Sequence, residues 1–179
     1  QQHSGCSWHP PTLWIGVGCE RNTSKSLIYR AISQSLNDAG FAIEAIAGLA
    51  TADRKADEPA LLALCHDFDW PLRTYTAEQL AVIPVPTPSQ AVFKEMGTAS
   101  VAEAAALLTA GDSGTLRQTK RIHHANESEQ GAVTIALAET AVPMAPHRGE
   151  LHLIGSGPGD PALLSGDATS ALRRCTAWV

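Results

Sequence analysis

Charged residues, aromatic residues and long apolar runs are all scarce in this sequence. Charged side chains make up 17% of the 179 residues and aromatic side chains 5%, whereas hydrophobic residues account for 44%. Such a composition is typical of a packed globular chain and argues against general disorder. No apolar run approaches the roughly 20 residues that a membrane-spanning helix needs, so we expect no membrane partner.

An excess of basic charge is missing as well. The chain has 13 Lys and Arg residues against 18 Asp and Glu residues, which gives a net charge of −5. A protein of this charge offers no broad surface to nucleic acid, and we expect no nucleic-acid partner. Any anionic ligand must therefore be bound by a local cluster of basic side chains.

Closely spaced cysteine pairs are also absent. Cys6, Cys19, Cys65 and Cys175 form no C-x-x-C motif, which argues against a disulfide framework and favours a reducing, cytoplasmic location. Cys6 and His9 have a spacing that a metal ion could use, but no second pair of ligands follows them. We therefore expect a linker there, with no metal site.

Strand patterns and helix patterns alternate through most of the chain. Five apolar runs predict strands, at residues 13–17, 42–47, 72–75, 116–122 and 132–138. Helical periodicity occupies most of the intervals between them. This alternation indicates an α/β fold, a three-layer α/β/α domain with a mostly parallel sheet of about five strands. The last two strands are joined directly and are candidates for an antiparallel pair.

Changes in composition divide the chain into four parts. Residues 1–12 are expected to form a tether and residues 13–139 the α/β domain. Residues 140–149, with two prolines and a glycine, are expected to form a linker. Residues 150–179 are left as a separate terminal segment, in which an apolar strand from Leu151 runs into a glycine-rich turn and a short helix.

Local signals predict several helix ends. A helix over residues 24–39 should end at Gly40, which takes the left-handed conformation at little cost. Another helix should begin with Asp57 as its cap and Pro59 in its first turn. The patterns Thr76 to Gln79 and Ser100 to Glu103 both match a capping box, in which two side chains satisfy the free N–H groups of a helix start.

Ligands of an open α/β sheet bind beyond the carboxyl ends of its parallel strands. The loops that follow the first three strands, at residues 16–24, 51–58 and 76–79, should meet there. The first two loops combine glycines, hydroxyl groups and basic side chains, which would suit a carboxylate or phosphate at a helix N-terminus. The candidate ligand-binding residues are Gly16, Gly18, Cys19, Arg21, Thr23, Ser24, Lys25, Arg54 and Lys55.

Other interpretations of these residues stay open. Gly16 and Gly18 would also ease a tight strand-to-helix turn beside a solvated charged rim, and the lack of a third glycine argues against a dinucleotide site. Cys19 at a helix N-terminus could be a nucleophile, although a half-buried turn residue is the simpler interpretation. The basic cluster from Lys120 to His124 is either a solvated strand end or an alternative anion-binding edge.

Five stretches occur in an order that resembles a known family: "LWIGVGCERNTS", "GLATADRKADEPALLALC", "WPLRTYTAEQL", "PTPSQAVFKEMGTASVAEAAAL" and "GAVTIALAE". They are similar to the C-terminal domain of the cobalamin biosynthesis protein CbiG, which is shared with the stand-alone protein CobE. The stretch "LHLIGSGPGDPALLSGDATSALRRCTAWV" resembles the opening of the tetrapyrrole (precorrin) methylases. The order of segments is similar to fusions of a CbiG-like region with a precorrin-3B methyltransferase.

The resemblance implies a role in corrin-ring synthesis. CbiG opens the δ-lactone of cobalt-precorrin-5A and expels acetaldehyde, so the implied partners are a precorrin or cobalt-precorrin and the other domains of a parent protein. Cobalt would arrive inside the substrate, so this fragment is expected to need no metal or cofactor of its own. Lactone opening requires an activated water, for which Glu20, Glu58 and Glu103 are candidate bases by location alone.

The methylase-like stretch implies the remnant of an S-adenosylmethionine site. In that family the glycine loop helps to line the cofactor cleft, which places the remnant at Gly155, Gly157, Pro158, Gly159 and Asp160. Roughly 30 residues cannot build a core of their own. We therefore expect neither methyltransferase activity nor measurable binding of S-adenosylmethionine.

Three functions remain open for the CbiG-like part. It could be the tetrapyrrole-binding domain of a cobalt-precorrin-5A hydrolase that contributes to the lactone opening. It could be a non-catalytic module that holds or hands on a precorrin, as the small stand-alone relatives would. A structural spacer between two enzyme domains is the third.

Overall fold

The structure is a computed structural model that describes residues 9–87, 100–143, 154–155 and 164–174. The chain divides into two compact units, Gln1–His147 and Arg148–Val179. The second unit contributes one described helix, α6 (Gly166–Arg174). None of the helices in the described ranges is long and apolar enough to cross a membrane.

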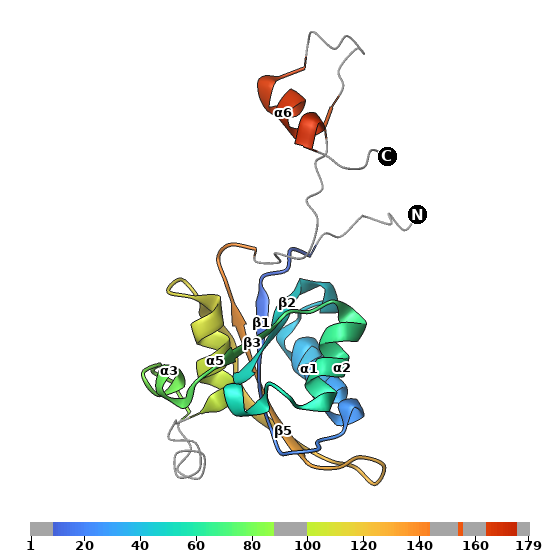
Figure 1. Cartoon of the computed structure of the whole chain (residues 1–179), viewed down its shortest axis with the longest axis vertical. Coiled ribbons are helices and arrows are strands. Elements are labelled where there is room, and N and C mark those ends of the chain that lie inside the picture. Colours follow the sequence, from blue (N-terminus) through green and yellow to red (C-terminus); the bar gives the residue numbers. More distant parts are fainter. Residues whose placement is uncertain (1–8, 88–99, 144–153, 156–163, 175–179) are drawn as a thin grey trace. The chain divides into compact units, whose positions relative to one another are not determined.

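One five-stranded sheet forms the centre of the first unit (Figure 1). In spatial order its strands are β3 (Leu72–Tyr75), β2 (Ile46–Ala52), β1 (Leu13–Cys19), β5 (Ala132–Glu139) and β4 (Thr115–His124). β1, β2 and β3 pair in parallel, whereas β5 is antiparallel both to β1 and to β4. Four strands therefore run in one direction and β5 in the other. The expected α/β class, the mostly parallel sheet and the antiparallel last pair are confirmed.

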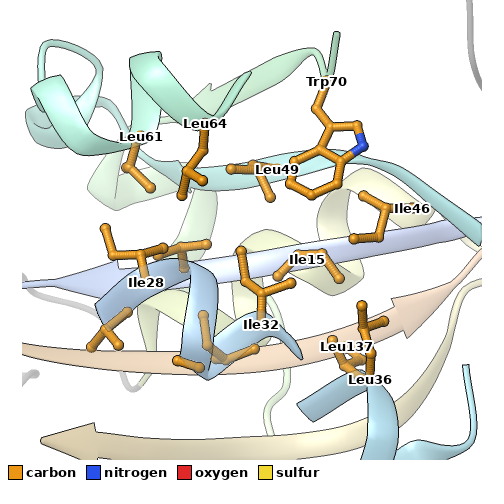
Figure 2. Packing of buried hydrophobic residues seen from close by; sticks show 14 of the residues in the cluster. Ile15, Ile28, Ile32, Leu36, Ile46, Leu49, Leu61, Leu64, Trp70 and Leu137 are labelled. Carbon is orange, nitrogen blue, oxygen red and sulfur yellow. The ribbon is translucent and has the colours of Figure 1, made fainter. Parts of the chain in front are cut away.

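Helices cover both faces of this sheet (Figure 1). α1 (Lys25–Ala39) and α2 (Pro59–Phe68) cover one face, and α5 (Val101–Ala110) covers the other with the short α3 (Ala77–Ala81) beside it. Figure 2 shows the larger core, in which Ile15 of β1 packs with Ile28 of α1 and Leu61 of α2. These branched side chains fill the space between the sheet and the helices α1 and α2.

α5 approaches β1 much more closely, because the facing residues are small. Ala104 and Ala105 of this helix are fully buried. A Cβ atom added to Gly16 would lie 1.8 Å from the carbonyl oxygen of Ala102, so the contact requires a glycine. The interpretation of Gly16 and Gly18 as turn residues is wrong, since both lie within β1 and neither has a positive φ.

Three strands differ by two or more residues from the expectation, and one of them is β1, which continues to Cys19. β2 covers Ile46–Ala52 and not residues 42–47, because Ile43–Ala45 form a 3-10 turn ahead of it. All of β2 is buried on a strand that helices cover on both faces, so it lacks the alternation that marks a half-exposed strand. β4 continues to His124, since its pairing with β5 extends as far as Ala132.

Two of the predicted helix boundaries are right and one is displaced. Gly40 ends α1 in the left-handed conformation, with a φ of 74°. Pro59 lies in the first turn of α2 as expected. The cap of that helix is Glu58 and not Asp57, because Asp57 is engaged by an arginine of the preceding loop.

The two expected capping boxes have different outcomes. The box at Thr76 is confirmed, since its hydroxyl accepts a hydrogen bond from the Gln79 backbone and the Gln79 side chain accepts one from the Thr76 backbone. The box at Ser100 is wrong, because the Ser100 side chain makes no cap hydrogen bond. Glu103 instead turns to β4, where its Oε1 accepts a hydrogen bond from the Lys120 N–H at 3.0 Å.

Several expected features lie outside the described residues. They include the tether up to residue 8, a helix at residues 89–96, most of the linker, and the strand that begins at Leu151. Gly157, Pro158, Gly159 and Asp160 of the glycine loop lie outside as well. The division at residues 139 and 149 stays a prediction.

Candidate ligand-binding site

A pocket of about 770 Å³ lies at the carboxyl edge of the sheet. Its walls come from the ends of β1 and β2, the first residues of α5, and the facing parts of β4 and β5. The volume falls within the range of about 300–1,000 Å³ that is typical of small-molecule sites. The position agrees with the rule that ligands of open α/β sheets bind beyond the carboxyl ends of the parallel strands.

Small residues make the space. Gly18, Ala52, Ala102 and Ala132 are among the lining residues, and we call these four small residues the floor of the pocket. A Cβ atom added to Gly18 would meet only Thr134 and Val101, each at an ordinary contact distance of 3.8 Å. The space in front of Gly18 therefore belongs to the pocket, whereas the space in front of Gly16 is filled by α5.

Basic side chains surround this apolar floor. Arg21, Arg54, Lys55 and Lys120 line the pocket, and Glu20 is the acidic residue among the lining. In a chain whose net charge is −5, these residues form a local concentration of positive charge. Such a cluster provides the charge-assisted hydrogen bonds that carboxylates accept.

Lys120 lines the pocket from β4, the edge strand that β5 separates from β1. β5 lies between β1 and β4, and its Thr134 pairs with Gly18 of β1 on one side and Ile122 of β4 on the other. Because β4 runs in the same direction as β1, its last residues lie at the same edge. The first loop and Lys120, which sequence reasoning treated as alternatives, thus line one pocket.

The rest of the basic cluster on β4 does not take part. Arg121 forms an ion pair with Asp38 of α1. His123 lies with Nδ1 at 3.2 Å from the Gln34 Oε1, also on α1. Burial and the neighbouring arginines lower the pKa of His123, which favours the neutral ring. Successive side chains of β4 point to opposite faces, and only one face opens into the pocket.

Arg21 connects the first two loops. Its guanidinium donates to the Asp57 Oδ1 at 2.6 Å and to the Arg54 carbonyl oxygen at 2.6 Å. The hydrogen bond between them raises the pKa of Arg21 and lowers the pKa of the Asp57 carboxyl. Arg21 therefore holds the rim of the pocket together, and part of its charge is balanced within the protein.

Glu58 lies beneath the same rim with a side chain that is 1% exposed. Its Oε1 accepts a hydrogen bond from the Asn22 N–H at 2.9 Å. Its Oε2 lies 3.6 Å from the Arg21 Nη1 and 3.9 Å from the Lys55 Nζ. Asn22 has a left-handed φ of 58°, which Asn tolerates better than most residues. Glu58 thus fixes the first loop and counters two cations of the rim.

Four predicted binding residues lie outside the lining: Gly16, Thr23, Ser24 and Lys25. The Ser24 hydroxyl accepts a hydrogen bond from the Gln130 N–H at 2.7 Å, which ties the start of α1 to the β4–β5 loop. Lys25 forms an ion pair with Asp67 of α2. The helix N-terminus that lines the pocket is that of α5, whereas the sequence pointed to that of α1.

Cys19 lines the pocket, but its environment opposes nucleophilic chemistry. Burial raises the pKa of its thiol to about 11, and the nearby Lys55 reverses only part of this effect. The thiolate is the reactive form of cysteine, so a thiol with this pKa is almost wholly protonated near neutral pH. Cys19 is half-buried, as the simpler interpretation expected, but it is the last residue of β1 and not a turn residue.

The three candidate bases occupy different environments. Glu20 lines the pocket. Glu58 is buried behind the rim, and Glu103 is fully buried, with Oε1 2.5 Å from the Thr87 hydroxyl that donates to it. Glu20 is therefore the one of the three whose carboxylate could reach a ligand directly.

Within the described ranges, no group of three or more His, Cys, Asp or Glu side chains lies together as metal ligands would. Gly155 is described and exposed, but the remainder of its loop lies outside the described residues.

Sequence reasoning missed the contribution of α5 and most of that of β4. Ser100, Val101 and Ala102 line the pocket beside Lys120 and Ile122. The basic cluster that contains Lys120 was a partial signal, but its place at this edge also requires β5 to run antiparallel to β1, which no local pattern shows. No local pattern marks Val101 or Ala102 as pocket residues.

The sequence of the first unit matches a protein family and two known relatives. Residues 13–138 match the family described as "Cobalamin synthesis G C-terminus". A cobalt-precorrin-5A hydrolase of Priestia megaterium is 33% identical over 135 residues, which cover 75% of this chain and 34% of the hydrolase. Protein CobE of Sinorhizobium sp. is 35% identical over 126 residues, which cover 69% of this chain and 82% of CobE.

A solved structure agrees with these matches. The crystal structure of CobE, a protein from the cobalamin (vitamin B12) biosynthetic pathway, has a TM-score of 0.64 and 28% sequence identity to this chain. The similarity covers 73% of this chain and 95% of that one. The chain thus spans about a third of the hydrolase but nearly the whole of the solved CobE.

Proposed function

This chain belongs to the cobalamin synthesis G C-terminus family, and we propose that it is a tetrapyrrole-binding domain of corrin-ring synthesis. The ligand is a precorrin or a cobalt-precorrin, with cobalt as part of the substrate. The observation that carries the proposal is the pocket at the carboxyl edge, where four basic side chains surround a floor of small residues in an otherwise acidic chain.

The chemistry of such a ligand matches the pocket. Precorrins carry acetate and propionate carboxylates around a large apolar ring. Gly18, Ala52 and Ala132 leave room for an apolar face, and the rim supplies Arg54, Lys55 and other cations to the carboxylates. Each charge-assisted hydrogen bond of this kind contributes roughly 1.5–3 kcal/mol.

The role that the site supports best is binding and positioning within a cobalt-precorrin-5A hydrolase. Lactone opening needs an activated water and a group that stabilises the oxyanion. Glu20 is the acidic residue of the lining, and Glu58 and Glu103 are engaged elsewhere. The hydrolase of Priestia megaterium is about three times as long as its match to this chain, which leaves ample room for the reacting groups in its other parts.

A carrier that holds the tetrapyrrole without chemistry is the second candidate. Its support is that CobE is covered to 82% by the match, so a protein of little more than this domain exists by itself. Release of acetaldehyde from cobalt-precorrin-5A by this chain alone would favour direct hydrolysis over both binding roles.

The terminal segment is part of the same proposal. On the glycine motif that begins at Gly155, we assign residues 150–179 to the start of a precorrin methyltransferase fused to the domain. S-adenosylmethionine would serve that enzyme and not the pocket. Calorimetry with S-adenosylmethionine tests the expectation that this short segment does not bind it.

The decisive experiment is a titration of the chain with uroporphyrin, a tetrapyrrole polycarboxylate, followed through its Soret absorption. We expect saturable binding that weakens with added salt, because the contacts are between charges. An Arg54→Gln, Lys55→Gln double variant should bind about tenfold to a hundredfold more weakly. Arg73→Gln is the matched control, since Arg73 is exposed on β3 outside the lining. No saturable binding, or equal loss in the control, would refute the proposal.

A further inference from the structure

The N-terminus of α5 faces the pocket, and the side chain of its N-cap residue makes no hydrogen bond to the helix. Ser100 occupies the N-cap position, and Ser100, Val101 and Ala102 all line the pocket. Ser100 is 2% exposed, yet its hydroxyl has no hydrogen-bond partner among the described residues. A buried hydroxyl without a partner is costly, so it indicates a position for a group that the protein itself does not supply.

The residue that would normally close this helix start points away from it. A Glu three residues after a Ser cap folds back onto the cap in a capping box. Here the Glu103 Oε1 accepts hydrogen bonds from the Lys120 N–H and the Thr87 hydroxyl instead. Glu103 is the acidic residue of the first turn, but its Oε1 is engaged by these two donors, so no side-chain hydrogen bond caps the start of α5.

Lys120 adds a positive charge that the described part of the chain does not balance. The ion pairs among the described residues engage Arg21, Lys25, Arg30, Lys55, Arg117 and Arg121. No such pair involves Lys120, although it lines the pocket. Its backbone is held by Glu103, so the lysine is fixed beside the start of α5 by the same carboxylate that leaves the helix cap empty.

We propose that the start of α5 is a carboxylate-binding subsite, built from the Ser100 hydroxyl, the first-turn N–H groups of α5 and the Lys120 ammonium. The inference rests on the proposed function, because it assigns one carboxylate of the tetrapyrrole to this position. The Ser100 hydroxyl and the N–H groups donate hydrogen bonds to the carboxylate oxygens, and Lys120 supplies the opposite charge. The remaining carboxylates reach Arg54 and Lys55 across the apolar floor.

The test measures uroporphyrin binding and thermal unfolding of three variants. Ser100→Ala removes the donor and should weaken binding about tenfold, with an equal or higher Tm because its buried hydroxyl makes no cap hydrogen bond. Ser100→Asp places a carboxylate at the cap, a residue that helix starts favour, and should abolish binding by occupying the subsite. Lys120→Gln keeps the backbone bond to Glu103 and should weaken binding about tenfold.

Thr76→Ala is the matched control. Thr76 caps α3 through a hydrogen bond that the structure shows, and it does not line the pocket. This variant should lower the Tm and leave binding unchanged, the reverse of Ser100→Ala.

The outcomes separate the subsite from the wider proposal. If the parent chain binds uroporphyrin and both Ser100 variants bind it equally well, the subsite is refuted while the proposed function stands. If Ser100→Ala lowers the Tm as Thr76→Ala does, with binding unchanged, Ser100 is a structural cap and the subsite is again refuted. If the parent does not bind uroporphyrin, the proposed function fails and the subsite with it. Should Ser100→Asp fail to fold, Ser100→Ala and Lys120→Gln decide the question.

Discussion

Replacement of Gly16 by alanine tests whether the close approach of α5 to β1 is essential. The added Cβ would lie 1.8 Å from the carbonyl oxygen of Ala102 and 2.9 Å from the Cβ of Ala106. The first of these atoms belongs to the helix backbone, so no side-chain rotation can relieve the overlap. Either α5 moves away from the sheet or β1 is displaced.

The expected cost follows from that geometry. Overpacking in a core costs about 1–3 kcal/mol and occasionally more, and a rigid backbone obstacle places this case at the upper end, at about 3 kcal/mol. The lower entropy of the unfolded chain returns less than about 1 kcal/mol of this. For a domain of this size each kcal/mol corresponds to about 4 °C, so we expect a decrease in Tm of about 10 °C.

Gly18→Ala is the control, two residues further along the same strand and on the same face. Its added methyl group would find only contacts at 3.8 Å, so the Tm should equal or exceed that of the parent. Thermal unfolding followed by far-UV circular dichroism compares the two variants. Equal Tm values for Gly16→Ala and the parent would show that α5 does not need this approach, and the account of the pocket wall would be wrong.

Three further predictions concern single side chains. The pKa of the Cys19 thiol is about 11, so at pH 8 it has about 100-fold less thiolate than a thiol of pKa 9.0. A more basic thiolate is also about tenfold more nucleophilic, which offsets part of this difference. Alkylation of Cys19 by iodoacetamide should therefore be about tenfold slower than alkylation of free cysteine. A similar rate in mass spectrometry would contradict the burial of this thiol. Glu58→Ala removes the acceptor of the Asn22 N–H and should cost about 2 kcal/mol in urea unfolding, whereas Glu58→Gln keeps an acceptor and should cost less. The hydrogen bond from Arg30 lowers the pKa of Glu129 from its ordinary 4.5, so the stability it contributes is complete above pH 4.5 and is lost as pH falls through the lower folded value. Glu129→Gln should therefore lower the Tm at pH 7 but not at strongly acidic pH. Glu127 is exposed, and Glu127→Gln should leave the Tm unchanged at both pH values.

The sequence predicted those features that depend on neighbours along the chain. The periodicity of α1 and its end at Gly40 need only residues within a few turns of one another, and both are confirmed. The capping box at Thr76 is local in the same way. The order of strands and helices also follows from local patterns, and it was enough to predict the α/β class and the antiparallel last pair.

Local patterns failed where distant segments compete for the same group. The Ser100 box has the right residues at the right spacing, yet Glu103 turns to the backbone of Lys120, which lies 17 residues further along the chain. Asp57 is drawn from the helix cap to Arg21, 36 residues away. In both cases a donor from a distant segment engages the side chain that the local motif would use: a charged guanidinium for Asp57, and a backbone N–H for the fully buried Glu103.

The pocket itself was decided by the tertiary structure. The sequence pointed to the carboxyl edge and to Gly18, Arg21, Arg54 and Lys55, because loops after parallel strands meet there. Which helix start faces the ligand depends on which helix lies against that side of the sheet, and α5 does so only because Gly16 leaves space for its backbone. Lys120 joins the rim because β5 is antiparallel to both β1 and β4, so β4 runs parallel to β1 and ends at the same edge. Side chains that are about 100 residues apart share one pocket through strand pairing, and no pattern within either segment contains that pairing.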